Sequence, residues 1–247
     1  MFMDSDQILN SPGRVLETAA DFLDLVYPPV CGLCFEPANS PDHLVCQKCW
    51  EAIRGFPEPF CLECRHFIRN ALSCPDCKGD TLIVFSLGVF DAGLKTIIHD
   101  LKFQCLKPLA VSLGIKLAEI INKYIAQPDF DLIIPVPLYR NTQNSRGFNQ
   151  AAEIAAAVGS ELGLIVNTDV LYQSRRTRQQ ARLGLKKRIK NVHQAFAIDD
   201  PDGILRGAKV LLIDDVTTTG ATLRENARVL YESGAKKITA AVAATAV

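Results

Sequence analysis

The chain has 247 residues, of which 48% are hydrophobic and 22% are charged, an ordinary composition for a globular protein. Lysine plus arginine balance aspartate plus glutamate at 27 each, so a global electrostatic attraction to nucleic acid or membrane is excluded. No apolar run approaches the roughly 18 residues of a transmembrane helix. The first ten residues contain two aspartates and no basic residue, unlike a secretory signal, so we expect a cytoplasmic protein without a membrane span.

Residues 1–30 are expected to hold one amphipathic helix. Ser11 followed by Pro12 is typical of a helix start, and Pro28 with Pro29 ends the helix. Between them, apolar residues recur at helical spacing, at Val15, Leu16, Ala19, Phe22, Leu23 and Val26. We expect this apolar face to pack on the rest of the protein rather than on a membrane.

Residues 31–80 are dominated by cysteine. Eight of the nine cysteines form four C-x-x-C pairs, which are Cys31/Cys34, Cys46/Cys49, Cys61/Cys64 and Cys74/Cys77. Each pair can direct two thiolates at one ion, and a structural Zn²⁺ takes four ligands, so the spacing predicts a double zinc ribbon with two zinc sites. The short gaps favour sequential pairing, first with second and third with fourth, and a cross-brace is the alternative. Disulfides are disfavoured because a cytosolic chain keeps its thiols reduced.

From residue 81 to residue 247, strand patterns alternate with helix patterns. Strands are predicted over 82–90, 131–137, 164–171, 210–213 and 237–244, and helices over 94–103, 108–126, 151–162 and 222–233. Such alternation predicts an α/β domain with a parallel sheet, right-handed crossovers and flanking helices. The chain is therefore expected to join this larger domain to the small cysteine-rich one.

The stretch from residue 210 to residue 223 is the most informative part of the chain. Val210–Ile213 has the pattern of a buried parallel strand, and Asp214 and Asp215 follow it directly. A small-residue run then leads into a helix, and it consists of Thr217, Thr218, Thr219, Gly220, Ala221 and Thr222. A helix N-terminus favours a phosphate, and neighbouring carboxylates suit sugar hydroxyls or a metal ion. The run resembles the phosphoribosyl-pyrophosphate (PRPP) motif of type I phosphoribosyltransferases.

Two further segments carry functional side chains. Arg146-Gly147-Phe148-Asn149-Gln150 precedes a helix, and Asn149 is expected to cap that helix. The segment 175–190 holds eight basic residues and no acid, and these are Arg175, Arg176, Arg178, Arg182, Lys186, Lys187, Arg188 and Lys190. Such a run is typical of a solvated segment, and it also offers cations for pyrophosphate or nucleic acid.

Taken in order, these motifs resemble the ComF family of competence-associated proteins over nearly the whole chain. The resemblance is carried by the C-x-x-C pairs, Leu101-Lys102-Phe103, Ile134-Pro135-Val136-Pro137, Arg146-Gly147-Phe148-Asn149-Gln150, Arg176-x-Arg178-x-Gln180 and Ile213 to Thr222. It implies a zinc-binding N-terminal module, a type I phosphoribosyltransferase domain, and a link to DNA uptake in natural transformation.

The same resemblance implies roles for individual residues. Asp214 and Asp215 hold the ribose hydroxyls of PRPP, directly or through Mg²⁺, and residues 217–222 hold its 5′-phosphate. The backbone at Val136 and Pro137 cradles the pyrophosphate. Arg178, within the segment Arg176 to Arg182, belongs to a lid that closes over the leaving group. Some type I transferases carry an acid as general base in the phosphate loop, whereas this chain has Thr217 and Thr218 there.

Two alternatives to a phosphoribosyltransferase stay open. In the first, the protein binds single-stranded DNA and uses PRPP as a regulatory ligand. The expected DNA contacts are then Arg175, Arg176, Arg182, Lys186, Lys187 and Arg188. In the second, the zinc ribbons dock on a partner protein, such as a DNA-processing protein. The acceptor of a transfer reaction and the oligomeric state are not indicated by any motif.

Overall fold

The computed structural model describes residues 29–38, 44–69, 73–77, 81–126, 129–176 and 192–246. The helix expected within residues 1–30 lies outside the described residues. So do Arg178 and the basic residues that follow it up to residue 190.

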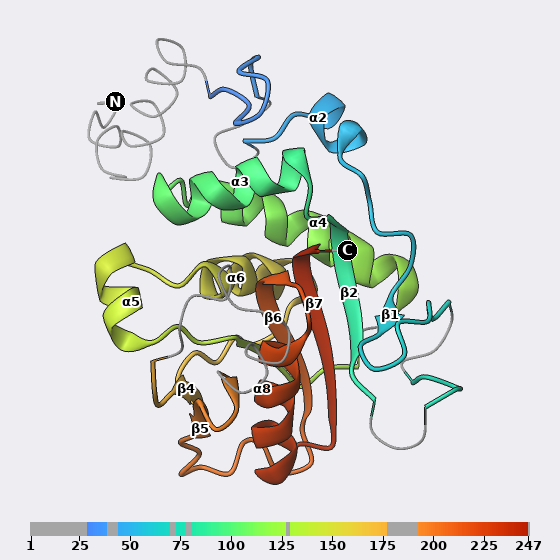
Figure 1. The fold of residues 1–247 in the computed structure, drawn as a ribbon, viewed down its shortest axis with the longest axis vertical. Coiled ribbons are helices and arrows are strands. Elements are labelled where there is room, and N and C mark those ends of the chain that lie inside the picture. Colours follow the sequence, from blue (N-terminus) through green and yellow to red (C-terminus); the bar gives the residue numbers. More distant parts are fainter. Residues whose placement is uncertain are drawn as a thin grey trace, which may run out of the picture.

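A five-stranded sheet forms the centre of the molecule, with the strand order β1-β2-β7-β6-β3 (Figure 1). These strands are Phe60–Cys61 (β1), Ile83–Val89 (β2), Lys237–Thr245 (β7), Lys209–Thr217 (β6) and Leu132–Pro135 (β3). The last four are parallel to one another, and β1 is antiparallel to β2 at one edge. The predicted α/β fold with a parallel sheet is therefore confirmed.

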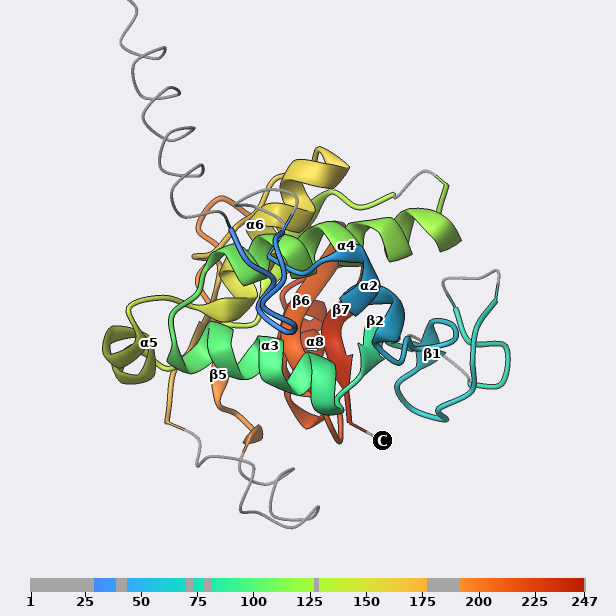
Figure 2. The same cartoon turned by 90° about the horizontal axis from the view of Figure 1, so that it is seen from above.

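The helices cover both faces of this sheet (Figures 1 and 2). On one face lie Ala92–Phe103 (α3), Pro108–Tyr124 (α4) and Gln150–Leu162 (α6), whose apolar residues form one core with alternate strand residues. On the other face lie Ala221–Glu232 (α8) and a hairpin of Leu171–Gln173 (β4) and Phe196–Ile198 (β5). Period-two alternation along the strands sends successive side chains into these two cores.

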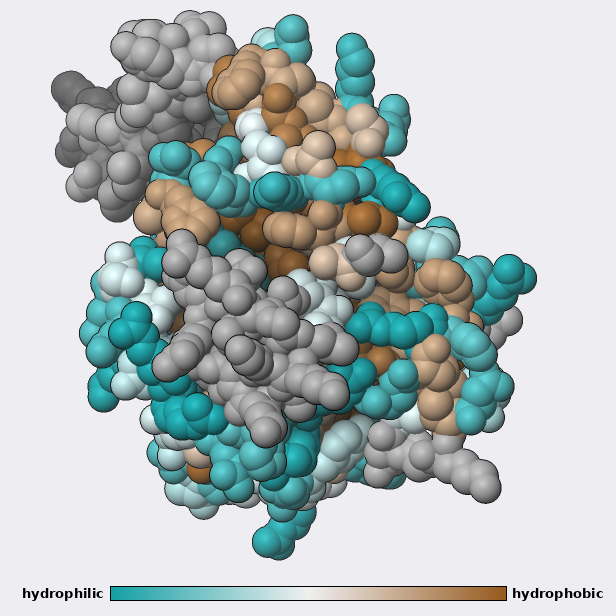
Figure 3. All heavy atoms as spheres, in the orientation of Figure 1, coloured by the Kyte–Doolittle hydropathy of each residue, from teal (hydrophilic) through white to brown (hydrophobic). Residues whose placement is uncertain are grey.

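Helices α4 and α6 approach each other very closely. At Gly114 in α4, a Cβ atom would lie 2.4 Å from the Cβ of Ala157 in α6, so only glycine permits this spacing. Two short helices, Gln47–Ala52 (α2) and Arg140–Arg146 (α5), lie outside the two layers. Figure 3 shows hydrophilic side chains over α8 and the β4–β5 hairpin, and a more hydrophobic surface near α3 and α4. None of the described helices has the length and apolarity that crossing a membrane requires.

Two strand predictions need correction. In place of the strand expected over 164–171, the chain forms one bridge between Val166 and Ile133, and Leu171 then begins the short strand β4. The side chain of Asn167 accepts hydrogen bonds from the N–H groups of Asp169 and Val170, at 3.0 and 2.9 Å, and so turns the chain away from the sheet.

The strand expected over 210–213 is longer than the sequence predicted. Strand β6 continues to Thr217, and its partner β7 pairs Val242 with Asp214 and Thr245 with Thr217. The two acidic residues therefore lie within the strand rather than after it. Backbone pairing with an alanine-rich neighbour keeps the strand regular where the side chains become polar.

The cysteine-rich segment is built onto the large sheet. Strand β1 pairs with β2, and Phe60 and Leu62 are fully buried in the core that α8 covers. In the other half of this segment, the N–H of Leu44 donates to Ser112 Oγ of α4 at 3.0 Å. A domain boundary near residue 80 stays a prediction, and the apolar residues on its two sides share their cores.

Candidate functional site

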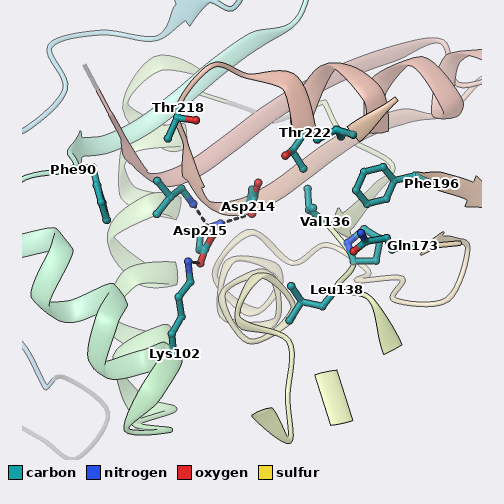
Figure 4. A pocket seen from close by; sticks show the side chains of 13 residues that line it. Phe90, Lys102, Val136, Leu138, Gln173, Phe196, Asp214, Asp215, Thr218 and Thr222 are labelled. Carbon is teal, nitrogen blue, oxygen red and sulfur yellow. Dashed lines mark hydrogen bonds and ion pairs between the residues drawn. The ribbon is translucent and has the colours of Figure 1, made fainter. Parts of the chain in front are cut away.

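A pocket of about 390 Å³ opens beside the carboxyl ends of β3 and β6 (Figure 4). In an open α/β sheet this edge is where ligands bind. Polar lining groups are Lys102, Gln173, Asp214, Asp215, Thr218 and Thr222, and apolar ones include Phe90, Val136, Leu138 and Phe196. The structure thus brings together the two acids, the start of the threonine loop and the segment after β3, as the sequence predicted.

The two acids are held rigidly by the backbone that follows each of them. Asp214 Oδ1 accepts from the N–H of Asp215, and Asp215 Oδ1 accepts from the N–H of Val216, both at 2.8 Å. Figure 4 shows both side chains at the centre of the pocket. Carboxylate oxygens are ligands that Mg²⁺ prefers, and they also accept hydrogen bonds from ribose hydroxyls.

Asp214→Asn is expected to stabilise the free protein at neutral pH. Burial, and then the neighbouring Asp215 carboxylate, raise the pKa of Asp214 well above its ordinary value of 3.8. A pKa that is higher in the folded than in the unfolded state means that stability is lost as pH rises above the unfolded value. Thermal unfolding at pH 7 should therefore give a higher midpoint for the variant, and the gain should vanish as pH falls toward 3.8. Equal midpoints at pH 7 would contradict this account.

Lys102 is the site residue that sequence reasoning missed. Its ammonium group forms an ion pair with Asp215 Oδ2 across the pocket (Figure 4). The buried face of α3, formed by Leu94, Ile97, Ile98 and Leu101, directs the helix so that Lys102 reaches the acids. The available signal was the position of Lys102 in the Leu101-Lys102-Phe103 motif. Among the described lining residues, Lys102 is the one cation beside two carboxylates.

The small-residue loop leads from β6 into the N-terminus of α8. Thr217 is the buried last residue of β6, whereas Thr218 and Thr222 line the pocket. Thr219 Oγ1 accepts from the N–H of Ala221 at 3.3 Å and so closes the turn. Gly220 is the N-cap of α8, with a left-handed φ of 77°. The positive end of the α8 dipole and its first N–H groups therefore lie at the pocket, and a helix N-terminus of this kind favours an anion.

Gly220→Ala is expected to lower the free energy of unfolding by about 2–4 kcal/mol. The positive φ strains any side chain, and a Cβ would also lie 2.6 Å from Leu62 Cδ1. Gly207→Ala is a matched control, because Gly207 has a φ of 74° but no atom within 4 Å of its added Cβ. Urea denaturation should show a clearly larger loss for residue 220. Equal losses would mean that the contact with Leu62 has no energetic role.

The segment after β3 is fixed by the Arg146–Gln150 motif. Asn149 Nδ2 donates to the carbonyl of Val136 at 3.0 Å, while Asn149 Oδ1 accepts from the N–H of Ala151 at 3.1 Å. The predicted cap of α6 is thus confirmed, and the same side chain ties the helix to the pocket wall. Gly147 takes a left-handed φ of 80°, which lets the chain turn from α5 into the cap.

Only the first part of the basic segment is described. Arg175 donates through Nη2 to the carbonyl of His193, which links the residues just after β4 to those just before β5. Arg176 is exposed. Neither lines the pocket. The expected lid residue Arg178 lies outside the described residues, as do the remaining DNA-contact candidates, Arg182, Lys186, Lys187 and Arg188.

The cysteines form two clusters in sequential order. Cys31, Cys34, Cys46 and Cys49 make up the first, and Cys61, Cys64, Cys74 and Cys77 make up the second. The sequential arrangement is therefore confirmed over the cross-brace. Sulfur–sulfur distances are 3.7 Å for Cys34–Cys46, 3.5 Å for Cys64–Cys74 and 3.8 Å for Cys61–Cys77.

These distances fit tetrahedral zinc, in which bonds of about 2.3 Å place the sulfur atoms about 3.8 Å apart. Burial raises the pKa of Cys31, but backbone N–H groups, including that of Cys46 at 3.4 Å, outweigh it and lower the pKa to about 6. A thiolate is thus favoured there before metal binds. Both clusters have the composition and geometry of structural zinc sites.

A parallel α/β sheet with paired acids and a helix N-terminus at its carboxyl edge, preceded by two clusters of four cysteines, defines a phosphoribosyltransferase-type protein with a zinc-ribbon module. Comparison with known proteins agrees. Residues 22–78 match the double zinc ribbon domain, and residues 109–246 match the phosphoribosyl transferase domain. The chain belongs to the phosphoribosyl transferase domain family and carries a double zinc ribbon in front of that domain.

Relatives with assigned names cover most of the chain. It is 27% identical over 221 residues to DNA utilization protein YhgH of Salmonella typhi, covering 87% of this chain and 96% of that protein. It is 28% identical over 205 residues to competence protein F of Haemophilus influenzae, covering 78% and 87%. The solved purine phosphoribosyltransferase of Pyrococcus horikoshii is 24% identical and covers 54% of this chain and 69% of its own, with a TM-score of 0.32.

Proposed function

We propose that the protein binds PRPP together with Mg²⁺ in the pocket at the ends of β3 and β6. The observation that carries the proposal is that two carboxylates and the N-terminus of α8 face one pocket. The loop 217–222 binds the 5′-phosphate, and Asp214 and Asp215 bind the ribose hydroxyls. The backbone at Val136 and Pro137, held by Asn149, binds the pyrophosphate.

Asp214 and Asp215 are also the side chains that would hold Mg²⁺, since the ion takes few protein carboxylates plus substrate phosphates. When bound, Mg²⁺ supplies positive charge against the pyrophosphate. The residues of the protein position the ribose and neutralise the remaining charge.

Calorimetric titration with PRPP tests the proposal. We expect saturable binding of one PRPP per chain in the presence of Mg²⁺, and much weaker binding when EDTA removes the metal. Ribose 5-phosphate and pyrophosphate, each added alone, should compete with PRPP because each occupies one part of the pocket. Absence of saturable binding in Mg²⁺ would refute the proposal.

Lys102→Ala is expected to weaken Mg-PRPP binding by about 10- to 100-fold. A charge-assisted hydrogen bond contributes about 1.5–3 kcal/mol, and Lys102 lies beside the acids where it can turn from Asp215 to a phosphate oxygen. Lys95→Ala is the control, because Lys95 is exposed on the same helix and does not line the pocket. If both variants bind PRPP like the unaltered protein, Lys102 has no part in the site.

We extend the proposal to transfer of the phosphoribosyl group. In that reaction the bond between C1′ and the pyrophosphate oxygen breaks, pyrophosphate leaves with its electron pair, and an acceptor nucleophile bonds to C1′ after losing a proton. Thr217 to Thr219 provide no carboxylate for that proton, so it must pass to another base, for which the departing pyrophosphate offers its oxygen atoms. Pyrophosphate release from Mg-PRPP on addition of bases or amines supports transfer. If none of these acceptors raises the rate of pyrophosphate release above that in buffer alone, the result counts against transfer.

A second proposal concerns the cellular role. Relatives bear the names DNA utilization protein and competence protein F, which favours a role with DNA. The basic run 175–190 is the candidate contact for single-stranded DNA. Binding of an oligonucleotide should weaken steeply with salt and with the double change Arg178→Glu, Lys187→Glu. Binding that both changes leave intact would remove this segment from the proposal.

A further inference from the structure

The second zinc ribbon touches the phosphate loop directly, although about 150 residues separate them in sequence. We call residues 61–65 the second knuckle. They comprise the turn between the first two cysteine ligands of that site and the residue that follows it. Arg65 of the knuckle donates through Nη2 to the carbonyl of Thr218 at 3.1 Å. This contact fixes a carbonyl of the very loop whose N–H groups are expected to face the phosphate.

Arg224, in the first turn of α8, joins the knuckle to the loop a second time. Its Nη1 donates to the carbonyl of Thr219 at 2.8 Å, and its Nη2 donates to the carbonyl of Leu62 at 2.9 Å. Its Nε forms an ion pair with Glu63 Oε1, also at 2.9 Å. One guanidinium group therefore holds both segments in a fixed relation.

Apolar packing closes the same contact. Leu62 is fully buried, and its side chain lies against Gly220, the N-cap of α8. The knuckle itself is folded by the two ligands that flank Leu62 and Glu63, namely Cys61 and Cys64. Because the loop rests on the knuckle through both polar and apolar contacts, the shape of the loop depends on the fold of the second zinc site.

The first zinc site differs from the second in the part of the protein that it contacts. Its segment rests on α4, where Gly32 lies against Leu109 and Leu44 binds Ser112. The hydrogen bond of this segment therefore runs to α4, whereas Arg65 of the second knuckle reaches the carbonyl of Thr218. The two sites have the same ligands but different neighbours.

We infer that zinc at the second site and PRPP at the loop are thermodynamically coupled. The inference rests on the proposed function. Zinc at Cys61, Cys64, Cys74 and Cys77 holds the knuckle, and the knuckle, through positioning residues Arg65 and Arg224, holds the loop in its phosphate-binding conformation. By linkage, PRPP must then strengthen zinc binding at the second site by the same factor.

Site-resolved cysteine alkylation tests this coupling on the full chain. The zinc-loaded protein is exposed to a zinc-selective chelator and N-ethylmaleimide, with and without saturating Mg-PRPP, and each cysteine peptide is quantified by mass spectrometry. Mg-PRPP should slow alkylation of Cys61, Cys64, Cys74 and Cys77 by at least about fivefold, the lower end of typical couplings. Alkylation of the first cluster should stay unchanged. Equal rates at the second site, or equal slowing at both, would overturn the inference.

Variants of Arg65 distinguish an effect on the position of the loop from an effect on the stability of the whole protein. Arg65→Met should weaken Mg-PRPP binding by at least about fivefold and remove the selective protection, while Arg65→Lys, which keeps a donor, should retain part of both. Arg69→Met is the control, because Arg69 is on the same ribbon but pairs with Glu58 away from the loop. Circular dichroism confirms that each variant is folded. Protection that persists in Arg65→Met would also overturn the inference.

Failure of the inference and failure of the proposed function give different results. If the unaltered protein shows no calorimetric binding of Mg-PRPP, the proposed function fails and the coupling fails with it. If it binds Mg-PRPP but the second cluster is not selectively protected, the binding site stands and the coupling alone is wrong.

Discussion

Replacing Cys61 and Cys64 by serine is expected to release one of two zinc ions and to destabilise the whole chain strongly. Binding of a structural zinc ion contributes about 10–16 kcal/mol to the folding free energy of small zinc-binding peptides. This is as large as or larger than the free energy of unfolding of most domains. Strand β1 starts in this ribbon and pairs with β2, and Phe60 and Leu62 are buried in the core under α8. Loss of the ribbon therefore exposes part of the central core, and far-ultraviolet circular dichroism should show reduced structure.

The matched change at the first ribbon should act more locally. Cys31→Ser with Cys34→Ser should also release one zinc ion, but that segment packs on α4, and its described residues add no strand to the central sheet. The single tryptophan, Trp50, lies in α2 beside this site, so its fluorescence reports the first ribbon separately. Equal loss of helical signal in both double variants would contradict the difference that we derive from the sheet.

Replacing Asp214 and Asp215 together by alanine is expected to weaken Mg-PRPP binding by about 10²- to 10⁴-fold. Hydrogen bonds to charged groups contribute about 1.5–3 kcal/mol each, and the double change removes both carboxylates of the pocket. The backbone of β6 is held by its pairing with β7, so the strand should survive the change. Calorimetry measures the loss, and circular dichroism checks the fold.

Asp202→Ala provides the control for that experiment, because Asp202 is exposed in a turn and does not line the pocket. It should bind Mg-PRPP with unaltered affinity. An affinity of the double variant within a few-fold of the unaltered protein would show that the acids do not hold the ribose or the metal.

Local patterns in the sequence predicted much of the fold and several of the residues that meet in the pocket. The apolar run at 210–213, the cap at Asn149 and the sequential pairing of cysteines all rest on residues near one another in the chain. Each was therefore visible as spacing, and the structure agrees with each. The threonine loop likewise starts α8 within one residue of the expected position.

Features set by distant contacts were not predictable in this way. Strand β6 extends through Asp214 and Asp215 because β7 pairs with it, and no local pattern shows that pairing. Lys102 reaches Asp215 from a helix more than a hundred residues earlier. In both cases tertiary context outweighs local propensity. The bridge at Val166 is different, because there a local turn at Asn167 competes with the predicted strand.

A structure determined with Mg-PRPP bound would show directly whether the loop and the two acids hold the ligand. We expect the 5′-phosphate on the N–H groups of the loop 217–222, the ribose hydroxyls at Asp214 and Asp215, and the pyrophosphate beside Val136 and Pro137. A pocket beside C1′ that is shaped for a planar base would further support transfer. PRPP bound away from Asp214 and Asp215, with its phosphate off the α8 N-terminus, would contradict the account.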